Sequence, residues 1–182
     1  MGRTSGAASP NNAGTSLASS STVQSRSRRT NWPRCQPSMI DVVNTFTMMI
    51  AAGTLDRCPE LKLIVLESGC GWLHWWLDKM DHWNEARLAG PSIELKPSEY
   101  VARQIWVSGD PDESSFGSVS EVAPSGRLLW ASDFPHLDIL ESEPSCTEEL
   151  YERLESLPDD VARGILGFNA CDVYGIDVHA AA

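Results

Sequence analysis

The segment that most constrains the fold runs from Leu128 to His136, with the sequence Leu-Leu-Trp-Ala-Ser-Asp-Phe-Pro-His. Its apolar start is typical of a strand that is buried on both faces, and the carboxylate of Asp133 follows directly after it. In parallel α/β proteins, ligands and catalytic residues gather at the carboxyl ends of the strands. The segment therefore predicts a strand over residues 127–133 with a candidate site residue at its C-terminal end.

Two further apolar runs, Leu61–Glu67 and Arg103–Ser108, also have the length and composition of buried strands. Helical patterns with candidate N-caps at Ser38 and Ser98 alternate with them. We expect helices or helical turns over residues 39–52, from 72 onward, 97–100, within 114–125, and over 146–157, 159–168 and 169–174. This alternation is typical of a parallel sheet covered by helices, the α/β class. A closed (β/α)8 barrel needs eight strands and about 250 residues.

The first 37 residues are rich in Ser, Thr and Arg and contain few large apolar side chains. They cannot bury enough surface to offset the entropy of ordering, so we predict a disordered tail over 1–37. We assign 38–176 to a partial α/β domain and 177–182 to a frayed C-terminus. The tail carries basic but no acidic side chains, which also leaves import into an organelle open.

The whole chain has a net charge of −11 and the tail holds five Arg, so the rest of the chain carries −11 − 5 = −16. Because phosphate contacts dominate nucleic-acid affinity, an acidic body argues against a nucleic-acid partner. No segment approaches the roughly 18 apolar residues of a membrane span, so no membrane partner is expected. No apolar signal region follows Met1, and we expect a cytoplasmic protein.

The chain has five cysteines and none of them forms a CxxC pair. An odd number without close pairs argues against a disulfide framework and a zinc finger, and favours a reducing compartment. Cys70 lies at the start of a predicted helix, where the helix dipole could lower its pKa. The sequence places no His beside it to act as a base, so we do not expect a nucleophile.

Polar side chains follow all three predicted strands, and their ends share one edge if the strands are parallel neighbours. Carboxylates and a His at such an edge can bind a divalent metal or move a proton. Asp133 is either paired with a metal or caps the following loop. Glu67 is either a base or ligand, or it anchors the turn at Gly69–Gly71. His136 either faces a small-molecule substrate or is solvated.

Five motifs are distinctive when they occur together and in this order. They are Gly53–Lys62, Glu67–Trp72, Lys96–Tyr100, Trp130–His136 and Ile165–Ala170. On these motifs, residues 45–176 resemble the C-terminal half of the amidohydrolase-related family, the amidohydrolase 2 branch, which includes enzymes like aminocarboxymuconate-semialdehyde decarboxylase. The resemblance implies the C-terminal part of a metal-dependent TIM barrel. It also implies hydrolysis or non-oxidative decarboxylation of a small carboxylated substrate, often cyclic or aromatic.

The resemblance also assigns roles to residues. The family's Asp at the end of the last strand, which binds the metal or transfers a proton, matches Asp133. Glu67 stands where the decarboxylases carry a His near the end of the sixth strand. The family's HxH pair and its fifth-strand His have no counterpart among the four His of this sequence. The implied cofactor is a divalent metal, zinc by analogy, and it lacks most of the three or four protein ligands that zinc requires.

We therefore expect a fragment of a metal-dependent amidohydrolase-family enzyme, with Asp133, His136 and Glu67 as catalytic candidates and Asp133 as a metal ligand. The alternative is a non-catalytic half-barrel, or a subunit that a partner completes. Three strands leave two open sheet edges, which favour self-association.

Overall fold

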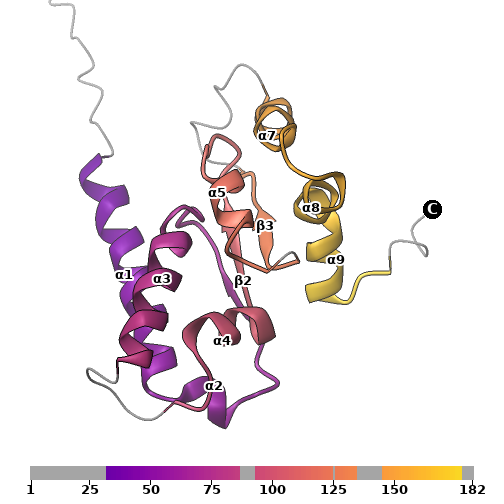
Figure 1. Cartoon of the computed structure of the whole chain (residues 1–182). Coiled ribbons are helices and arrows are strands. Elements are labelled where there is room, and N and C mark those ends of the chain that lie inside the picture. Colours follow the sequence, from indigo (N-terminus) through magenta and orange to yellow (C-terminus); the bar gives the residue numbers. More distant parts are fainter. Residues whose placement is uncertain (1–31, 87–92, 125, 135–144, 178–182) are drawn as a thin grey trace, which may run out of the picture. The chain divides into compact units, whose positions relative to one another are not determined.

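The computed structural model describes residues 32–86, 93–124, 126–134 and 145–177, and the side chains from Met39 onward. These residues belong to one unit, 31–182. Three helix–strand units come first (Figure 1). They are α1 (Trp32–Ala51) and α2 (Thr54–Arg57) before β1 (Leu63–Val65), α3 (Trp72–Glu85) and α4 (Pro97–Gln104) before β2 (Ile105–Gly109), and α5 (Phe116–Ser120) before β3 (Leu128–Trp130). A C-terminal group of helices follows, consisting of α7 (Cys146–Leu154), α8 (Asp159–Arg163), the π-helical turn η1 (Gly164–Phe168) and α9 (Asn169–Tyr174).

The three strands form a parallel sheet in the order β1-β2-β3. Val65 pairs with Val107, and Val107 pairs with Leu128 in the next strand. Each strand reaches its neighbour through a crossover that contains helix, as a parallel sheet requires. The predicted class, a partial α/β barrel with about three parallel strands, is confirmed.

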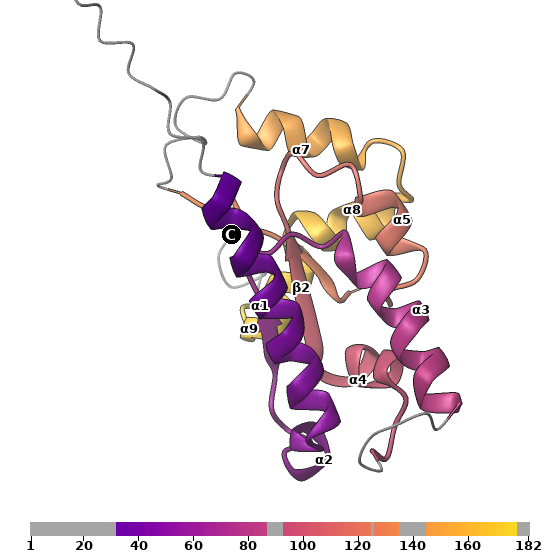
Figure 2. The same ribbon diagram turned by 90° about the vertical axis from the view of Figure 1, so that its left-hand side faces the viewer.

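Apolar side chains fill both sides of the sheet. On one side, Val65, Val107 and Leu128 pack against α1, α3 and α5 in the larger core. Within it, Phe46 of α1 packs edge-on against Trp72 of α3, with ring centroids 5.3 Å apart. On the other side, Trp106 and Leu129 pack against Val173 of α9. Figure 1 shows α1 and α9 on opposite sides of β2, and Figure 2 looks at the molecule from the side of α1.

The C-terminal helices are tied to β3 by two side-chain hydrogen bonds. The buried Asn169 amide donates to the Leu128 carbonyl at 2.8 Å, and the Trp130 indole donates to the Leu166 carbonyl at 3.2 Å. Gly164 leaves room for Asn169, because a Cβ there would lie 2.8 Å from the amide oxygen. The turn from Ile165 to Ala170 therefore serves to attach the end of the chain to the sheet.

Several element boundaries differ from the predictions. Helix α1 begins at Trp32 and passes through Pro33 and Pro37, so Ser38 is not its cap. Helix α4 begins at Pro97, where the missing N–H costs little because the first amides of a helix are unpaired in any case. Ser98 therefore lies inside that helix and is not its cap. The strands are shorter than the apolar runs that predicted them, because only three to five residues of each are paired.

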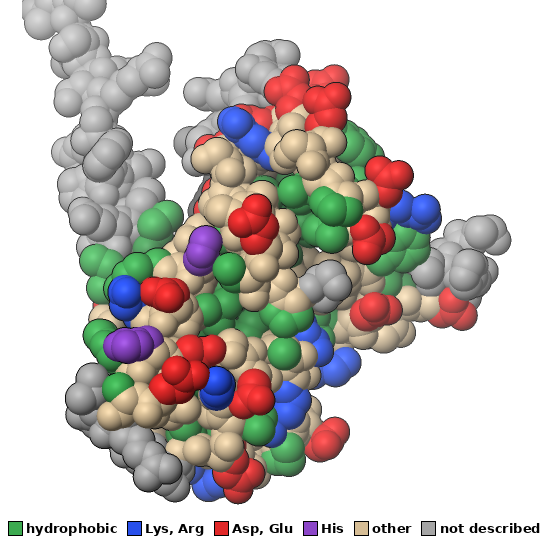
Figure 3. Space-filling model, in the orientation of Figure 1, with side chains coloured by type: hydrophobic (Ala, Val, Ile, Leu, Met, Phe, Trp, Pro, Cys, Tyr) green, Lys and Arg blue, Asp and Glu red, His purple; other side chains and the backbone are tan. Residues whose placement is uncertain are grey.

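Acidic side chains are spread over several elements of the face seen in Figure 3. Exposed apolar side chains include Met39 and Ile40 of α1 and Trp75 of α3. No helix in the described ranges is long and apolar enough to cross a membrane.

Candidate active-site edge

Two of the predicted site residues share an unusual backbone conformation. Glu67 follows β1 and has φ 55°, and Asp133 follows β3 and has φ 54°. Among the described residues, these are the two non-glycine residues with left-handed φ. Such a conformation costs a residue with a Cβ about 1–2 kcal/mol, and it is found preferentially at functional sites. The chain thus turns sharply at the carboxyl ends of both outer strands, with a carboxylate at each turn.

The two carboxylates differ in exposure. Glu67 is exposed, whereas Asp133 is partly buried and interacts with its surroundings. His136, the third catalytic candidate, lies outside the described residues. The structure therefore places Glu67 and Asp133 at the same edge of the sheet, one beyond each outer strand.

A third carboxylate, Glu113, organises this edge. One of its oxygens accepts the backbone N–H of Cys70 at 2.8 Å and that of Asp110 at 3.1 Å. The other accepts the N–H of Gly71 at 3.2 Å and the hydroxyl of Ser115 at 3.2 Å. Glu113 thus joins the turn after β1 to the end of β2. The anchoring of the Gly69–Gly71 turn, one of the two roles considered for Glu67, is performed by Glu113.

The sequence offered one weak signal for this role of Glu113, the glycines that surround it. A Cβ on Gly69 would lie 2.6 Å from a Glu113 oxygen, and Gly69 also has φ 61°. A Cβ on Gly109 would lie 2.8 Å from the other oxygen and 2.5 Å from the Phe116 ring. Both positions therefore require glycine so that the carboxylate can approach the backbone closely.

Cys70 lies beneath this cluster and its side chain is buried. Burial raises the pKa of its thiol from 9.0 to about 12, and the negative charge of Glu113 acts in the same direction. The lowering by the helix dipole that the sequence suggested is outweighed. Because the thiolate is the nucleophilic form, the raised pKa disfavours a nucleophilic role for Cys70.

Two buried hydroxyls near the strand ends lack hydrogen-bond partners within the described part of the chain. They belong to Ser68, which is 3% exposed, and Ser108, which is 1% exposed. Successive side chains of a strand point to opposite faces of the sheet. A Cβ added to Gly109 would point to Phe116, so the side chain of the preceding residue, Ser108, points to the other face. Buried polar atoms are normally paired with protein or water, so these two hydroxyls mark places where a partner is needed.

The metal site implied by the resemblance is incomplete. In the ranges that the structure describes, no three His, Cys, Asp or Glu side chains are grouped closely enough to hold a metal ion. Glu67 follows β1 and Asp133 follows β3, and β2 lies between these two strands. The two carboxylates therefore do not come from neighbouring strands. The described residues therefore do not fit a complete metal site, and further ligands would have to come from elsewhere.

Comparisons with known proteins give a consistent picture. No curated protein matches the sequence. An amidohydrolase from Mycobacterium avium subsp. paratuberculosis K-10 aligns with a TM-score of 0.60 at 21% identity, over 72% of this chain and 32% of that one. A 5-carboxyvanillate decarboxylase from Sphingomonas paucimobilis aligns with a TM-score of 0.52 at 26% identity, over 71% of this chain and 38% of its own.

A second 5-carboxyvanillate decarboxylase, from Novosphingobium aromaticivorans, aligns with a TM-score of 0.54 at 17% identity, over 70% of this chain and 37% of that one. Its structure holds manganese and 3-methoxy-4-hydroxy-5-nitrobenzoic acid. The chain thus spans about a third of the length of these solved structures. The family model described as "Amidohydrolase" matches residues 25–176, which is most of the sequence. The chain belongs to the amidohydrolase family.

Proposed function

We propose that this chain forms the C-terminal part of a metal-dependent amidohydrolase-family enzyme that removes a carboxyl group from a small cyclic or aromatic carboxylate. The observation that carries the proposal is the left-handed backbone at both Glu67 and Asp133. Backbone strain at two carboxylates on the same sheet edge is more readily explained by a site than by stability, because glycine would relieve it. Family membership gives this edge its chemistry.

Decarboxylation is preferred over hydrolysis because the neighbour with the highest identity of the three, at 26%, is a 5-carboxyvanillate decarboxylase. Hydrolysis of a small carboxylated substrate is the second candidate. We also propose that the chain belongs to the branch that contains aminocarboxymuconate-semialdehyde decarboxylase. Loss of CO₂ from an aromatic ring requires a proton donor at the carbon that loses the carboxylate. Asp133, partly buried at the end of β3, is the residue we propose for carrying that proton or for binding the metal.

The proposed cofactor is a divalent metal, either zinc or the manganese that one neighbour holds. A metal at the strand ends would supply positive charge for orienting the substrate carboxylate. Asp133 would be one of its ligands, together with donors outside the described residues, of which His136 is a candidate. Glu113 would keep the turn after β1 in place beside the substrate. We propose a small-molecule substrate as the partner and the cytoplasm as the location.

The alternative is a non-catalytic half-barrel, and a metal titration separates the two proposals. The full chain would be titrated with Mn²⁺ and with Zn²⁺ in a calorimeter, and CO₂ release from 2-hydroxybenzoate-type carboxylates would be measured in parallel. If the chain is part of the proposed enzyme, we expect it to bind metal and Asp133→Asn to weaken that binding at least tenfold. Asp112→Asn, at an exposed site, is the matched control. Equal binding by the wild type and by Asp133→Asn contradicts the role of Asp133 as a metal ligand, and metal binding that Asp133→Asn weakens favours the enzyme over the non-catalytic half-barrel.

A further inference from the structure

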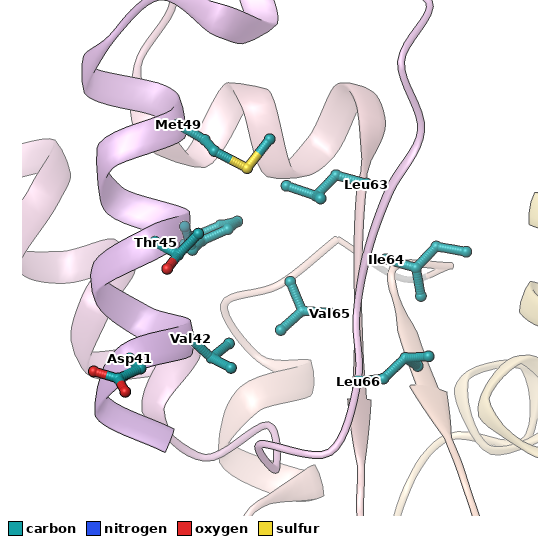
Figure 4. A pocket seen from close by; sticks show the side chains of 9 residues that line it. Asp41, Val42, Thr45, Met49, Leu63, Ile64, Val65 and Leu66 are labelled. Carbon is teal, nitrogen blue, oxygen red and sulfur yellow. The ribbon is translucent and has the colours of Figure 1, made fainter. Parts of the chain in front are cut away.

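Two open hollows flank helix α1. One lies between α1 and β1 and has a volume of about 320 Å³. Figure 4 shows that Leu63 and Val65 point toward α1 across this hollow, while Asp41 points away, so its facing walls are apolar. The other has a volume of about 450 Å³ and lies between α1, the first turn of α3 and the turn that precedes α3. This second hollow combines apolar walls with polar groups, and we call it the Trp75 pocket.

Aromatic and aliphatic side chains form the walls of the Trp75 pocket. Trp72 and Trp75 of α3 both line it, and residues three apart lie next to each other on the surface of a helix. Ile40 of α1 lines it from the other side, and the packing of Phe46 against Trp72 holds the two helices together. Trp75 is 58% exposed and Ile40 is 53% exposed, so much of both side chains faces solvent and can contact a ligand.

Glu113 gives the Trp75 pocket a negative charge. Among the described residues that line the pocket, it is the one with a charged side chain. Its carboxylate accepts hydrogen bonds from Cys70, Gly71, Asp110 and Ser115, and all four donors are neutral groups. Neutral donors stabilise a negative charge but do not cancel it. No Lys or Arg of the described residues forms an ion pair with Glu113, so the pocket places an uncompensated carboxylate beside two indole rings.

The hydroxyl of Ser68 is a further polar group of this pocket. Ser68 lines the pocket and is 3% exposed, and its hydroxyl has no hydrogen-bond partner within the described ranges. Each oxygen of Glu113 already accepts two hydrogen bonds, whereas the Ser68 oxygen is a free acceptor. Because buried polar atoms are normally paired, a ligand with an N–H donor would supply the partner that Ser68 lacks.

We propose that the Trp75 pocket binds a small organic ammonium ion with an apolar body. The ammonium group lies near Glu113 and the indole rings, because both a carboxylate and the face of a Trp ring attract a cation. One of its N–H groups donates to the Ser68 hydroxyl, and its apolar body contacts Ile40. The volume of about 450 Å³ is within the range of small-molecule pockets. This ligand is opposite in charge to the carboxylate substrate proposed above, so the two proposals can fail separately.

The test compares three probes that share a phenyl group and a short chain but differ in charge. They are 2-phenylethylammonium, 2-phenylethanol and phenylacetate, which are cationic, neutral and anionic. Each is titrated into the isotope-labelled full chain, and NMR follows the backbone amide of Gly71 and the indole N–H of Trp75, two residues that line the pocket. We expect the ammonium ion to bind about tenfold more tightly than the alcohol, and phenylacetate to leave both signals unshifted.

Three variants locate the binding site on the protein. Trp75→Ala should weaken binding of 2-phenylethylammonium about tenfold, because it removes an exposed wall of the pocket. Trp83→Ala makes the same change on the same helix, at a residue that is 50% exposed and does not line the pocket, and should leave binding unaltered. Ser68→Ala should weaken binding about threefold without lowering the Tm, because the Ser68 hydroxyl has no partner to lose within the described chain.

Three results would overturn the proposal. One is equal binding of the ammonium ion and the alcohol by the wild-type chain, a comparison that stays valid even if a variant does not fold. Another is tighter binding of phenylacetate than of the ammonium ion, which would make the pocket an anion site. The third is a dimer in sedimentation that Trp75→Ala disrupts while 2-phenylethylammonium shifts neither signal, which would make a second copy of the chain the occupant.

Discussion

Replacing Glu113 by Gln tests whether this side chain holds the carboxyl edge of the sheet together. The glutamine side chain would keep one oxygen, which can still accept from Cys70 and Asp110. Its amide nitrogen would then face the N–H of Gly71, and that hydrogen bond would be lost. The substitution retains the size of the side chain, so packing against Gly69 and Gly109 is not the variable.

The expected loss of stability follows from the hydrogen bonds that Glu113→Gln removes or weakens. Losing one hydrogen bond to a charged acceptor costs about 1.5–3 kcal/mol. Hydrogen bonds to a charged group are about twice as strong as neutral ones, so the two backbone bonds that remain each weaken by roughly 0.5–1 kcal/mol. We therefore expect Glu113→Gln to lower the free energy of unfolding by about 3 kcal/mol. For a chain of this size that corresponds to a fall in Tm of about 6–12 °C.

The assay is urea and thermal unfolding followed by circular dichroism, with Glu121→Gln as the control. Glu121 is exposed, and its replacement makes the same change of charge. A second readout is the rate at which a maleimide labels Cys70, which lies beneath the cluster and should react faster once the turn loosens. If Glu113→Gln unfolds within about 0.5 kcal/mol of the Glu121→Gln control, the account of Glu113 as the anchor of this edge is wrong.

Three further predictions concern stability. Because folding raises the pKa of Cys70 from 9.0 to about 12, its contribution to stability is complete below pH 9 and is lost as the pH rises toward 12. The free energy of unfolding should fall by about 2 kcal/mol more in the wild type than in Cys70→Ala between about pH 9 and 10.5, and equal slopes in urea titrations would exclude this. Glu67→Gly should be more stable than Glu67→Ala by about 1 kcal/mol. Both variants remove the carboxylate, but only glycine adopts a φ of 55° without strain. A more stable Ala variant in the same titrations would show that the turn carries no strain. Asn169→Ala should lower the free energy of unfolding by about 1–3 kcal/mol, because it leaves the buried Leu128 carbonyl unpaired. Asn44→Ala, at an exposed site, should leave it unchanged. Differential scanning calorimetry would measure both effects.

The sheet could be predicted because its strands are buried on both faces and appear in the sequence as uninterrupted apolar runs. Val107 and Leu128 belong to such runs, and both pack in the core beneath the helices. The placement of Asp133 after the last strand was predictable for the same reason, since a charge at the end of an apolar run marks where the strand leaves the core. The beginning of α1 was not predictable, because Pro37 resembles a boundary in sequence and yet lies inside the helix.

Glu113 was missed because its role depends on residues far away in the chain. It bonds to Cys70, 43 residues earlier, and in sequence it is one of several acids that follow β2. The same is true of Asn169, whose partner Leu128 lies 41 residues earlier. Local patterns determine which residues form a strand or a helix, whereas these contacts depend on how the elements pack. The unusual φ of Glu67 also escaped prediction, because left-handed backbone is expected at Gly or Asn and rarely at Glu.

The most direct test of the central proposal is to read the native transcript through and upstream of the codon for Met1. The proposal that this chain is the C-terminal part of a metalloenzyme predicts an upstream segment, in frame, that encodes an HxH strand and a further His-bearing strand. An in-frame stop codon directly upstream, with translation beginning at Met1, would contradict the proposal and leave the half-barrel as the complete product.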